Sequence, residues 1–586
     1  MDADSSAERG SSDISSNTYI IGALFICALV FVVFAPSLSN GFVNWDDDAN
    51  LLDNYAWRGL SFQNIAWMFT TFHMGHYIPL TWLSFGADYV VWGLNPFGYH
   101  FTALLLHAVN AVLFFFCLNR LFRCALPDEG QAQRLLASLL GTLFFAVHPL
   151  RVESVCWVTA RRDLVSGLFV LSAVLFYLRY VGSGAKKFYA ASLALFGGAV
   201  LSRESAAALP LALLVLDAYP LRRLNTGQWK AVLLEKMPFF ILSAFAAVSA
   251  VVATRHIDCI QPLAESGFMS RMGLAVYGMG FYLWKTLVPL QFSHLYAIPP
   301  GFTLLSCAAL LSALLVVLTV FMAWRWRRYP AFAAALAVYF VFILPTGGFA
   351  ATISLAYDRF SYLACMGFAA LFGAGSVFAV RKFGLKPSVL AFSAVLVLLG
   401  VKSFAQIGVW RDSAALWTNA MENGSPHFRA QALSARGKVY LEAGQLSLAR
   451  SDFENSLRIT LVDGALLGLA QTAMLSGDEA RAQKTVAFML ERNILPADAF
   501  LIRSAMALRG GNHNAAIGAL DEAIKISPDD CRLYNNRGLA YEKAGNPAAA
   551  YADYVAALSR KPGYALAAEN LARVSALSSA RKNTQR

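Results

Sequence analysis

The sequence predicts an all-α protein in which a polytopic membrane bundle of about eleven helices precedes a C-terminal α-solenoid of short helical repeats. Three observations predict this class. Broadly apolar residues make up 57% of the 586-residue chain and charged residues only 14%, whereas about a quarter of a soluble domain is charged. Apolar runs long enough to cross a bilayer recur up to residue 407. After about residue 410 the composition becomes polar and a helical repeat begins.

The predicted spans each cover about 30 Å of hydrocarbon. The first follows a polar tail, 1–17, that lacks the basic residues of a cleaved signal, so this span is expected to be retained. Another apolar stretch, 271–290, is interpreted as re-entrant or lying along the membrane surface, because counting it would reverse the side of every later basic cluster. The predicted spans are 18–38, 98–120, 134–150, 164–181, 188–202, 205–221, 237–254, 302–324, 330–345, 360–380 and 387–407.

Lys and Arg recur at every second junction between predicted spans, as expected where that side is cytoplasmic. This parity predicts a cytoplasmic tail at 1–17, a transmembrane domain at 18–409 with an outer loop at 39–97, and an outward repeat domain at 410–586. The same bias explains the net charge of +12, so a nucleic-acid partner is not expected. The eight cysteines are scattered without metal-ligand spacing, which predicts neither a disulfide framework nor a metal site.

The repeat has a period of 33 or 34 residues. Its glycines are each followed five residues later by alanine, and the last two units share a proline seventeen residues after the glycine. This is the tetratricopeptide pattern: glycine closes the turn between two helices, alanine lets them pack closely, and proline ends the second helix. Such arrays bind peptides in a concave groove, or serve as packed extensions without a ligand. The positions are Gly444, Gly477, Gly511, Gly545, Ala449, Ala482, Ala516, Ala550, Pro528 and Pro562.

The outer loop after the first span carries Asp46, Asp47 and Asp48 only a few residues from the membrane. Adjacent carboxylates repel one another, which raises at least one pKa unless a cation or hydrogen bonds compensate. The group is either part of a solvated loop or a pair suited to a general base beside a second group that binds a hydroxyl or a metal.

Other ionisable residues lie at the outer ends of predicted spans, where charge is unfavourable unless it pairs, snorkels or lines a cavity. A cationic outer cavity facing an acidic loop would suit a phosphate-bearing lipid, whereas ion pairs that only hold helix ends are the other interpretation. These residues are His148, Arg151, Glu153, Arg161, Arg162, Asp163, Arg203, Glu204, Arg255, His256, Asp358 and Arg359.

Several motifs occur in an order that resembles the transmembrane and tetratricopeptide-repeat O-mannosyltransferase family and its bacterial relatives, within the GT-C glycosyltransferases. The likeness covers about residues 18–586. Its blocks are FVNWDDDAN (42–50), YIPLTWLSFGADYVVWGLNPFGYHFTALLLHAVN (77–110), LFFAVHPLRVESVCWVTARRDLVSGLF (143–169), SRESAAALPLALLVLDAYPLRR (202–223), LYAIPPG (295–301), YDRFSYL (357–363) and the repeats.

The resemblance implies inverting transfer of mannose or another hexose from a polyprenyl-phosphate donor to a protein Ser or Thr hydroxyl on the outer face of a membrane. It implies a bacterial inner membrane with periplasmic repeats that receive the acceptor. The family places an acidic residue of the first outer loop as base, which the resemblance carries to Asp46 or Asp47, with Asp46 favoured and Asp47 orienting it or binding a sugar hydroxyl. Arg161, Arg162, Arg203 and Arg359 are the donor-phosphate candidates, and the sugar or acceptor candidates are His148, Glu153, His294, Asp358 and Glu204.

The sequence departs from the family pattern at three places. Arg203 replaces the usual lysine, Asp48 is a third aspartate, and Ala364 stands where proline is common. No cofactor is implied beyond the lipid donor, and dependence on a divalent cation is left open. A lipid or glycan acceptor, and a non-enzymatic scaffold that recruits partners through its repeats, are the alternative functions; a transporter fits less well, because its site would lie near the midplane.

Overall fold

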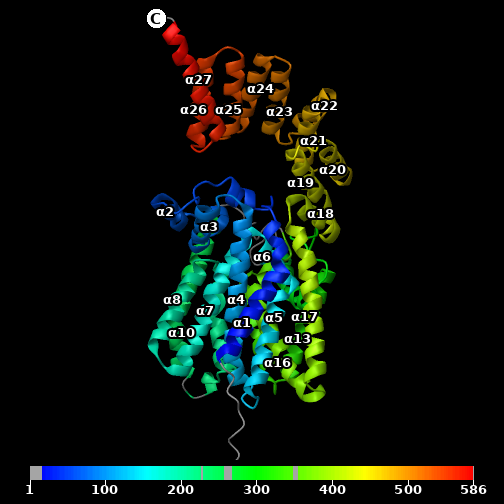
Figure 1. The fold of residues 1–586 in the computed structure, drawn as a ribbon. Helices are drawn as coiled ribbons and strands as arrows, with labels where there is room; N and C mark the ends of the chain where they lie inside the picture. The colour runs from blue at the N-terminus through cyan, green and yellow to red at the C-terminus, as the bar shows by residue number, and fades with distance from the viewer. Residues whose placement is uncertain (1–15, 226, 228, 256–266, 347–353, 585–586) are drawn as a thin grey trace, which may run out of the picture. The chain divides into compact units, whose positions relative to one another are not determined.

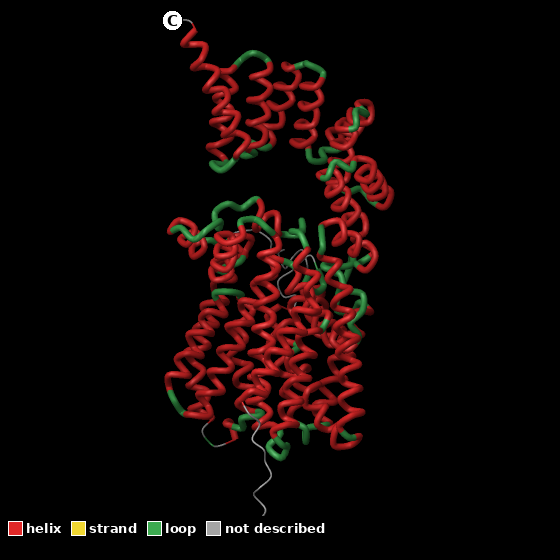
Figure 2. Tube along the Cα trace, in the orientation of Figure 1, coloured by secondary structure: helices red, strands yellow, loops and turns green. Residues whose placement is uncertain are grey.

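The structure is a computed structural model that describes residues 16–225, 227, 229–255, 267–346 and 354–584. The predicted tail at 1–17 and His256 therefore lie largely outside the described residues. The chain divides into two compact units, one of residues 1–419 and 423–425 and the other of residues 420–422 and 426–586. The described residues of both consist of helices and loops (Figure 2).

The first unit is a bundle whose long helices lie side by side, with α2 and α3 at one end (Figure 1). We call this the site end, because residues 40–78, 148–160, 202–208 and 354–361 meet there. The helices of this unit are α1 (Ser16–Phe34), α2 (Phe62–Thr70), α3 (Pro79–Trp92), α4 (Pro96–Ala125), α5 (Gln131–Val147), α6 (Val152–Cys156), α7 (Arg161–Ser183), α8 (Lys186–Val200), α9 (Leu209–Ala218), α10 (Trp229–Arg255), α12 (Phe268–Leu287), α13 (Cys307–Arg325), α14 (Pro330–Ile343), α15 (Ser361–Ala364), α16 (Met366–Phe383), α17 (Leu385–Ile407) and α18 (Ser413–Asn423).

Seven helical segments of the described chain are long and apolar enough to cross a membrane, which fits an integral membrane protein. They contain α1, α4, α7, α10, α13, α16 and α17. An eighth is formed by α5 with the turn and helix at 149–156, which meet at a bend of 58°. The other three predicted spans correspond to α8, α9 and α14, helices of 15, 10 and 14 residues.

The stretch predicted as re-entrant or surface-lying forms α12, a continuous helix of 20 residues. Near its end, the Thr286 carbonyl accepts a hydrogen bond from His148 Nε2 at 3.2 Å. At its start, the Met269 carbonyl accepts from the Leu304 backbone at 2.9 Å, just before α13. The end of α14 lies at the site end, because Phe342 and Arg203 line the same small pocket. The preceding helix, α13, runs in the opposite direction, so α13 begins at the site end. Both ends of α12 thus lie on one side of the bundle.

Close helix packing positions the site. α4 is surrounded by α1, α5 and α7, and its His107 bonds to the Tyr362 hydroxyl at 2.9 Å and the Ala146 carbonyl at 3.0 Å. α5 and α16 meet through Gly141 and Gly373, where a Cβ on Gly373 would overlap the carbonyl of Ala137. The backbones therefore approach more closely than larger side chains allow.

The second unit consists of paired antiparallel helices. The repeat glycines lie between the two helices of each pair with φ of 72° to 79°, a left-handed conformation that favours glycine. The repeat alanines are fully buried, which confirms the tetratricopeptide prediction. The helices are α19 (Arg429–Glu442), α20 (Leu446–Ile459), α21 (Asp463–Leu475), α22 (Glu479–Glu491), α23 (Pro496–Arg509), α24 (His513–Ile526), α25 (Cys531–Lys543), α26 (Pro547–Arg560) and α27 (Ala565–Thr584).

Candidate active site

Asp47 holds the first outer loop in place. Its carboxylate is fully buried; Oδ2 accepts a hydrogen bond from the Val43 backbone at 3.0 Å. Oδ1 accepts from the Thr159 backbone at 3.1 Å and from the Thr159 hydroxyl at 2.7 Å. Thr159 belongs to η5 (Val158–Ala160), the turn that begins the segment carrying α7. Asp47 thereby ties the acidic loop to the start of α7.

Asp46 has a different environment. Its side chain is half-buried, and the described residues place no hydrogen-bond donor on its carboxylate. Burial raises the pKa of Asp46 to about 6, and the Asp48 charge adds to this, while Arg359 and Arg162 act to lower it. The result is a carboxylate with free lone pairs that is ionised at neutral pH and close to its pKa, as a general base requires.

Three buried arginines form a cluster at the starts of different elements: the charges of Arg162 and Arg359 act on Asp46, and Arg203 lies near those two arginines. Arg203 pairs with Asp163, and Arg359 pairs with Glu153, whose other oxygen accepts from the Arg359 backbone at 3.1 Å. Arg162, at the start of α7, makes no ion pair or hydrogen bond within the described residues, although Glu204, Asp46 and Glu153 influence its charge. A buried guanidinium without a partner is unfavourable unless an anion joins it.

A second polar pair lies beside Arg162. The Glu204 carboxylate is 3.1 Å from His76 Nδ1, and both side chains are partly exposed. Burial would raise the pKa of Glu204, but His76 and Arg162 together lower it to about 2. Glu204 therefore stays anionic at the edge of the arginine cluster, where it can accept from a sugar or acceptor hydroxyl.

Asp358 precedes Arg359 in the chain, and His294 lies near enough to Arg359 for that charge to act on its imidazole. The Asp358 carboxylate accepts from the Tyr296 hydroxyl at 3.0 Å, and burial raises its pKa. His294 is 2% exposed with both ring nitrogens unbonded in the described structure, and it packs edge-to-face on Trp45 and Trp417. Burial, with Arg359, lowers the pKa of His294 to about 3, so its imidazole is neutral.

The structure separates two of the sequence-based candidates from this cluster. The Arg161 guanidinium bonds to Asp88 at 2.5 Å and to the Tyr99 carbonyl at 2.7 Å, and it lies over the Phe85 ring. His148 donates to the Thr286 carbonyl and accepts from the Leu150 backbone. The neighbours Arg161 and Arg162 therefore point to different surroundings, as residues about 100° apart on a helix do.

Sequence reasoning missed the partners that complete the cluster. His76, Thr159 and Tyr296 bond to Glu204, Asp47 and Asp358, but they are far from these acids in the chain or lack charge. The recurrence of aromatic and polar residues in the outer loops was the only signal for them. Among the described residues, no group of three or more His, Cys, Asp and Glu side chains is arranged to hold a metal ion.

Parts of this chain are similar in sequence to known proteins. Models described as "TPR repeat" and "Tetratricopeptide repeat" match residues 508–545 and 532–564. Human protein O-mannosyl-transferase TMTC3 is 34% identical over 173 residues, 28% of this chain and 17% of the relative. Drosophila melanogaster Tmtc3 is 32% identical over 193 residues, which are 30% of this chain and 21% of the relative. Mus musculus TMTC4 is 41% identical over 106 residues, which are 17% of this chain and 14% of the relative. The resemblance to the TMTC-like O-mannosyltransferases is confirmed.

The matched segments span about a fifth or less of these TMTC relatives. Among solved structures, the tetratricopeptide protein YrrB matches with 17% identity and a TM-score of 0.22, covering 33% of this chain and 96% of YrrB. The Cut9–Hcn1 structure matches with 14% identity and a TM-score of 0.25, covering 89% of this chain and 99% of that one.

Proposed function

We propose that the protein is a membrane glycosyltransferase that moves mannose or another hexose from a polyprenyl-phosphate donor to a protein Ser or Thr hydroxyl. The unbonded Asp46 carboxylate beside the unpaired Arg162 guanidinium supports this most, because it offers a base and an anion site at the end of an apolar bundle. The protein O-mannosyl-transferase names of the relatives agree with the same chemistry.

In the proposed reaction, the acceptor hydroxyl loses its proton to Asp46 as its oxygen bonds to the anomeric carbon. The bond from that carbon to the phosphate oxygen breaks, and the leaving polyprenyl phosphate takes the electron pair. Arg162 would stabilise the developing phosphate charge, with Arg203 and Arg359 adding positive potential. Attack opposite the leaving group inverts the anomeric carbon, and no covalent enzyme intermediate is needed.

The proposed topology follows the alternation of basic junctions. We place the N-terminus in the cytoplasm, and both the site end and the repeat domain on the outer face of the membrane. In a bacterial inner membrane, this is the periplasmic face. The repeats would bind the protein acceptor, since tetratricopeptide arrays serve protein recognition. This favours a protein over a lipid or glycan acceptor.

The full-length protein, purified and supplied with polyprenyl-phosphate mannose and a Ser/Thr-rich protein acceptor, is expected to add hexose to the acceptor, as measured by intact-mass spectrometry. Asp46→Asn removes the base and should lower turnover by about 10²–10⁴-fold. Asp48→Asn is the matched control, because among the described residues the Asp48 side chain accepts a hydrogen bond from the adjacent Ala49 backbone alone.

Size-exclusion profiles and thermal unfolding should show that both variants fold. Wild-type turnover in Asp46→Asn would remove Asp46 from the base position. Hexose transfer to lipid or glycan acceptors but never to protein would overturn the proposed acceptor, and no transfer to any acceptor would leave the scaffold function as the better explanation.

A further inference from the structure

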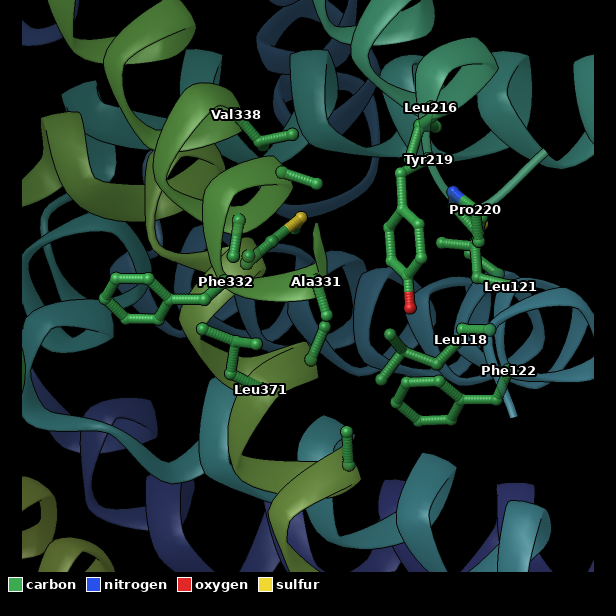
Figure 3. A pocket seen from close by; sticks show the side chains of 18 of the residues that line it. Leu118, Leu121, Phe122, Leu216, Tyr219, Pro220, Ala331, Phe332, Val338 and Leu371 are labelled. Carbon is green, nitrogen blue, oxygen red and sulfur yellow. The ribbon is translucent and has the colours of Figure 1, made fainter. Parts of the chain in front are cut away.

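A large apolar cavity lies inside the bundle, away from the acidic loop. Its volume is about 640 Å³, within the range of about 300–1,000 Å³ typical of ligand pockets. Side chains from α4, α9, α14 and α16 line it, and Figure 3 shows Leu118, Phe122, Val338 and Leu371 around the central space. Such a lining suits a hydrocarbon chain rather than a polar ligand.

The cavity is closed toward the site end. There its lining consists of Leu209, Phe342 and Leu363, each less than a tenth exposed. The pocket beyond Phe342 and Leu363, which reaches Arg203 and Arg359, holds only about 20 Å³, room for about one water molecule. A lipid chain therefore has no passage from the arginine cluster into this cavity.

The cavity is open at the other end of the bundle. Arg222 follows α9 and Arg328 precedes α14, and both line the cavity with exposed side chains, as does Tyr329. Within the described residues neither arginine has an acidic partner, whereas the neighbouring Arg223 pairs with Asp217 and Glu235. In Figure 3, Tyr219 extends into the space and presents its hydroxyl there.

We propose that this cavity binds one chain of an anionic phospholipid from the leaflet at this end, with the phosphate held between Arg222 and Arg328. Arginine forms charge-assisted, often bidentate hydrogen bonds with phosphate, and basic pockets between membrane helices bind anionic lipid headgroups. The chain leaves the bilayer for an equally apolar cavity, so the headgroup decides which lipid binds. A zwitterionic lipid brings a positive group toward the two arginines and binds less well.

Native mass spectrometry of the full-length protein in detergent can test this proposal, with phosphatidylglycerol and phosphatidylcholine of identical chains as probes. Wild-type protein should bind phosphatidylglycerol more tightly than phosphatidylcholine. Arg222→Gln with Arg328→Gln should weaken that binding about 25-fold, because each arginine near a lipid phosphate contributes about fivefold. Arg325→Gln with Arg327→Gln is the matched control, since these arginines are exposed but do not line the cavity, and should bind as wild type.

A second variant separates chain from headgroup. Val338→Trp fills the cavity without touching the arginines and should also abolish the preference, while thermal unfolding checks that the bundle folds. Equal binding of both lipids, or unchanged binding by Arg222→Gln with Arg328→Gln, would overturn the proposal. So would polyprenyl phosphate that occupies the cavity in a manner dependent on Arg162 but not on Arg222 and Arg328, because the cavity would then belong to the sugar donor.

Discussion

Asp46 and Asp47 are neighbours in the chain, yet the fold gives their carboxylates different environments. Asp47 accepts three hydrogen bonds from Val43 and Thr159 and is fully buried. Asp46 is half-buried, no donor among the described residues bonds to its carboxylate, and the charges of Arg162 and Arg359 act on it. Because a base needs free lone pairs and an approach path, Asp46 is the group that can accept a proton, while Asp47 fixes the loop that presents it.

The pH dependence of turnover follows from the raised pKa of Asp46. The carboxyl is protonated below its pKa of about 6 and cannot accept the hydroxyl proton, so turnover should rise with pH up to about 6 and level off above it. The kcat/KM for the donor, measured from pH 4.5 to 8, reports the free protein and should fall about tenfold per pH unit below the pKa.

Asp47 also has a pKa raised to about 6 by burial, so a control is needed. Thr159→Val removes the hydroxyl that lowers the pKa of Asp47 and raises that pKa further. If Asp46 is the base, the pH below which turnover falls stays near 6 in this variant. A shift of this fall in turnover to higher pH with Thr159→Val, or turnover that is constant from pH 5 to 7, would contradict the assignment of Asp46 as the base.

Two adjacent arginines should respond differently to the same substitution. Arg162→Lys replaces an unpaired guanidinium facing the site and should raise the donor KM about tenfold or more, leaving thermal stability unchanged. Arg161→Lys leaves Asp88 and the Tyr99 carbonyl poorly bonded and should destabilise the protein by about 1–3 kcal/mol without changing the donor KM. Steady-state kinetics and thermal unfolding on both variants separate the two roles, and the reverse pattern would contradict them.

These arginines show how far sequence analysis reaches at the residue scale. Their position at the outer end of a predicted span indicated charge that orientation does not explain, which pointed to the site. Which of the two faces Asp46 depends on the angle at which α7 begins, and η5 sets that angle through its bonds to Asp47. Likewise, the contact of His294 with Trp45 and Trp417 joins distant segments that no local pattern relates.

At the element scale, regular periodicity was the most informative signal. The spacing of glycine and alanine predicted the paired helices of the second unit, because each position has a fixed role in the turn or the packing. The predicted spans at 205–221 and 330–345 became shorter helices, of 10 and 14 residues, whereas the span at 188–202 became a helix of the predicted length that begins two residues earlier. Hydropathy measures apolar length alone. Where a helix starts depends also on prolines in the first turn, here Pro149, Pro210 and Pro330, and on the short turns at the site end.

The contact between α5 and α16 gives a prediction at this scale. A Cβ at Gly373 would overlap the Ala137 carbonyl and approach the Gly141 backbone at 3.1 Å, so Gly373→Ala should force the helices apart and destabilise the bundle by about 1–3 kcal/mol. A Cβ at Gly375, on the same helix, meets nothing within 4 Å. Gly375→Ala should be neutral, or stabilising by up to about 1 kcal/mol through helix propensity. Thermal unfolding in detergent measures both, and equal destabilisation would contradict this account.

At the scale of the whole molecule, the two compact units do not divide where the composition of the sequence changes. Composition predicted a boundary at 409/410, but the first unit continues to residue 419. The Gly41 backbone donates to the Arg411 carbonyl, the Asn44 backbone donates to the Ser413 hydroxyl, and Trp417 Nε1 donates to the Asn44 side chain at 2.8 Å. The segment at 411–419 thus holds the residues that precede Asp46.

Two truncations should therefore behave differently although they differ by only a few residues. A chain ending at residue 425 keeps Ser413 and Trp417 and should still transfer hexose from the lipid donor to a short Ser/Thr peptide, while losing efficient transfer to a folded protein acceptor. A chain ending at residue 410 loses the bonds to Gly41 and Asn44, so the loop carrying Asp46 loosens and turnover on both acceptors should fall. Residues 426–586, which have hydrophobic clusters of their own, should fold alone as a helical protein by circular dichroism. Equal peptide turnover by the two truncations would show that residues 411–419 do not position the base, and full activity on folded acceptors without the repeats would remove them from acceptor binding.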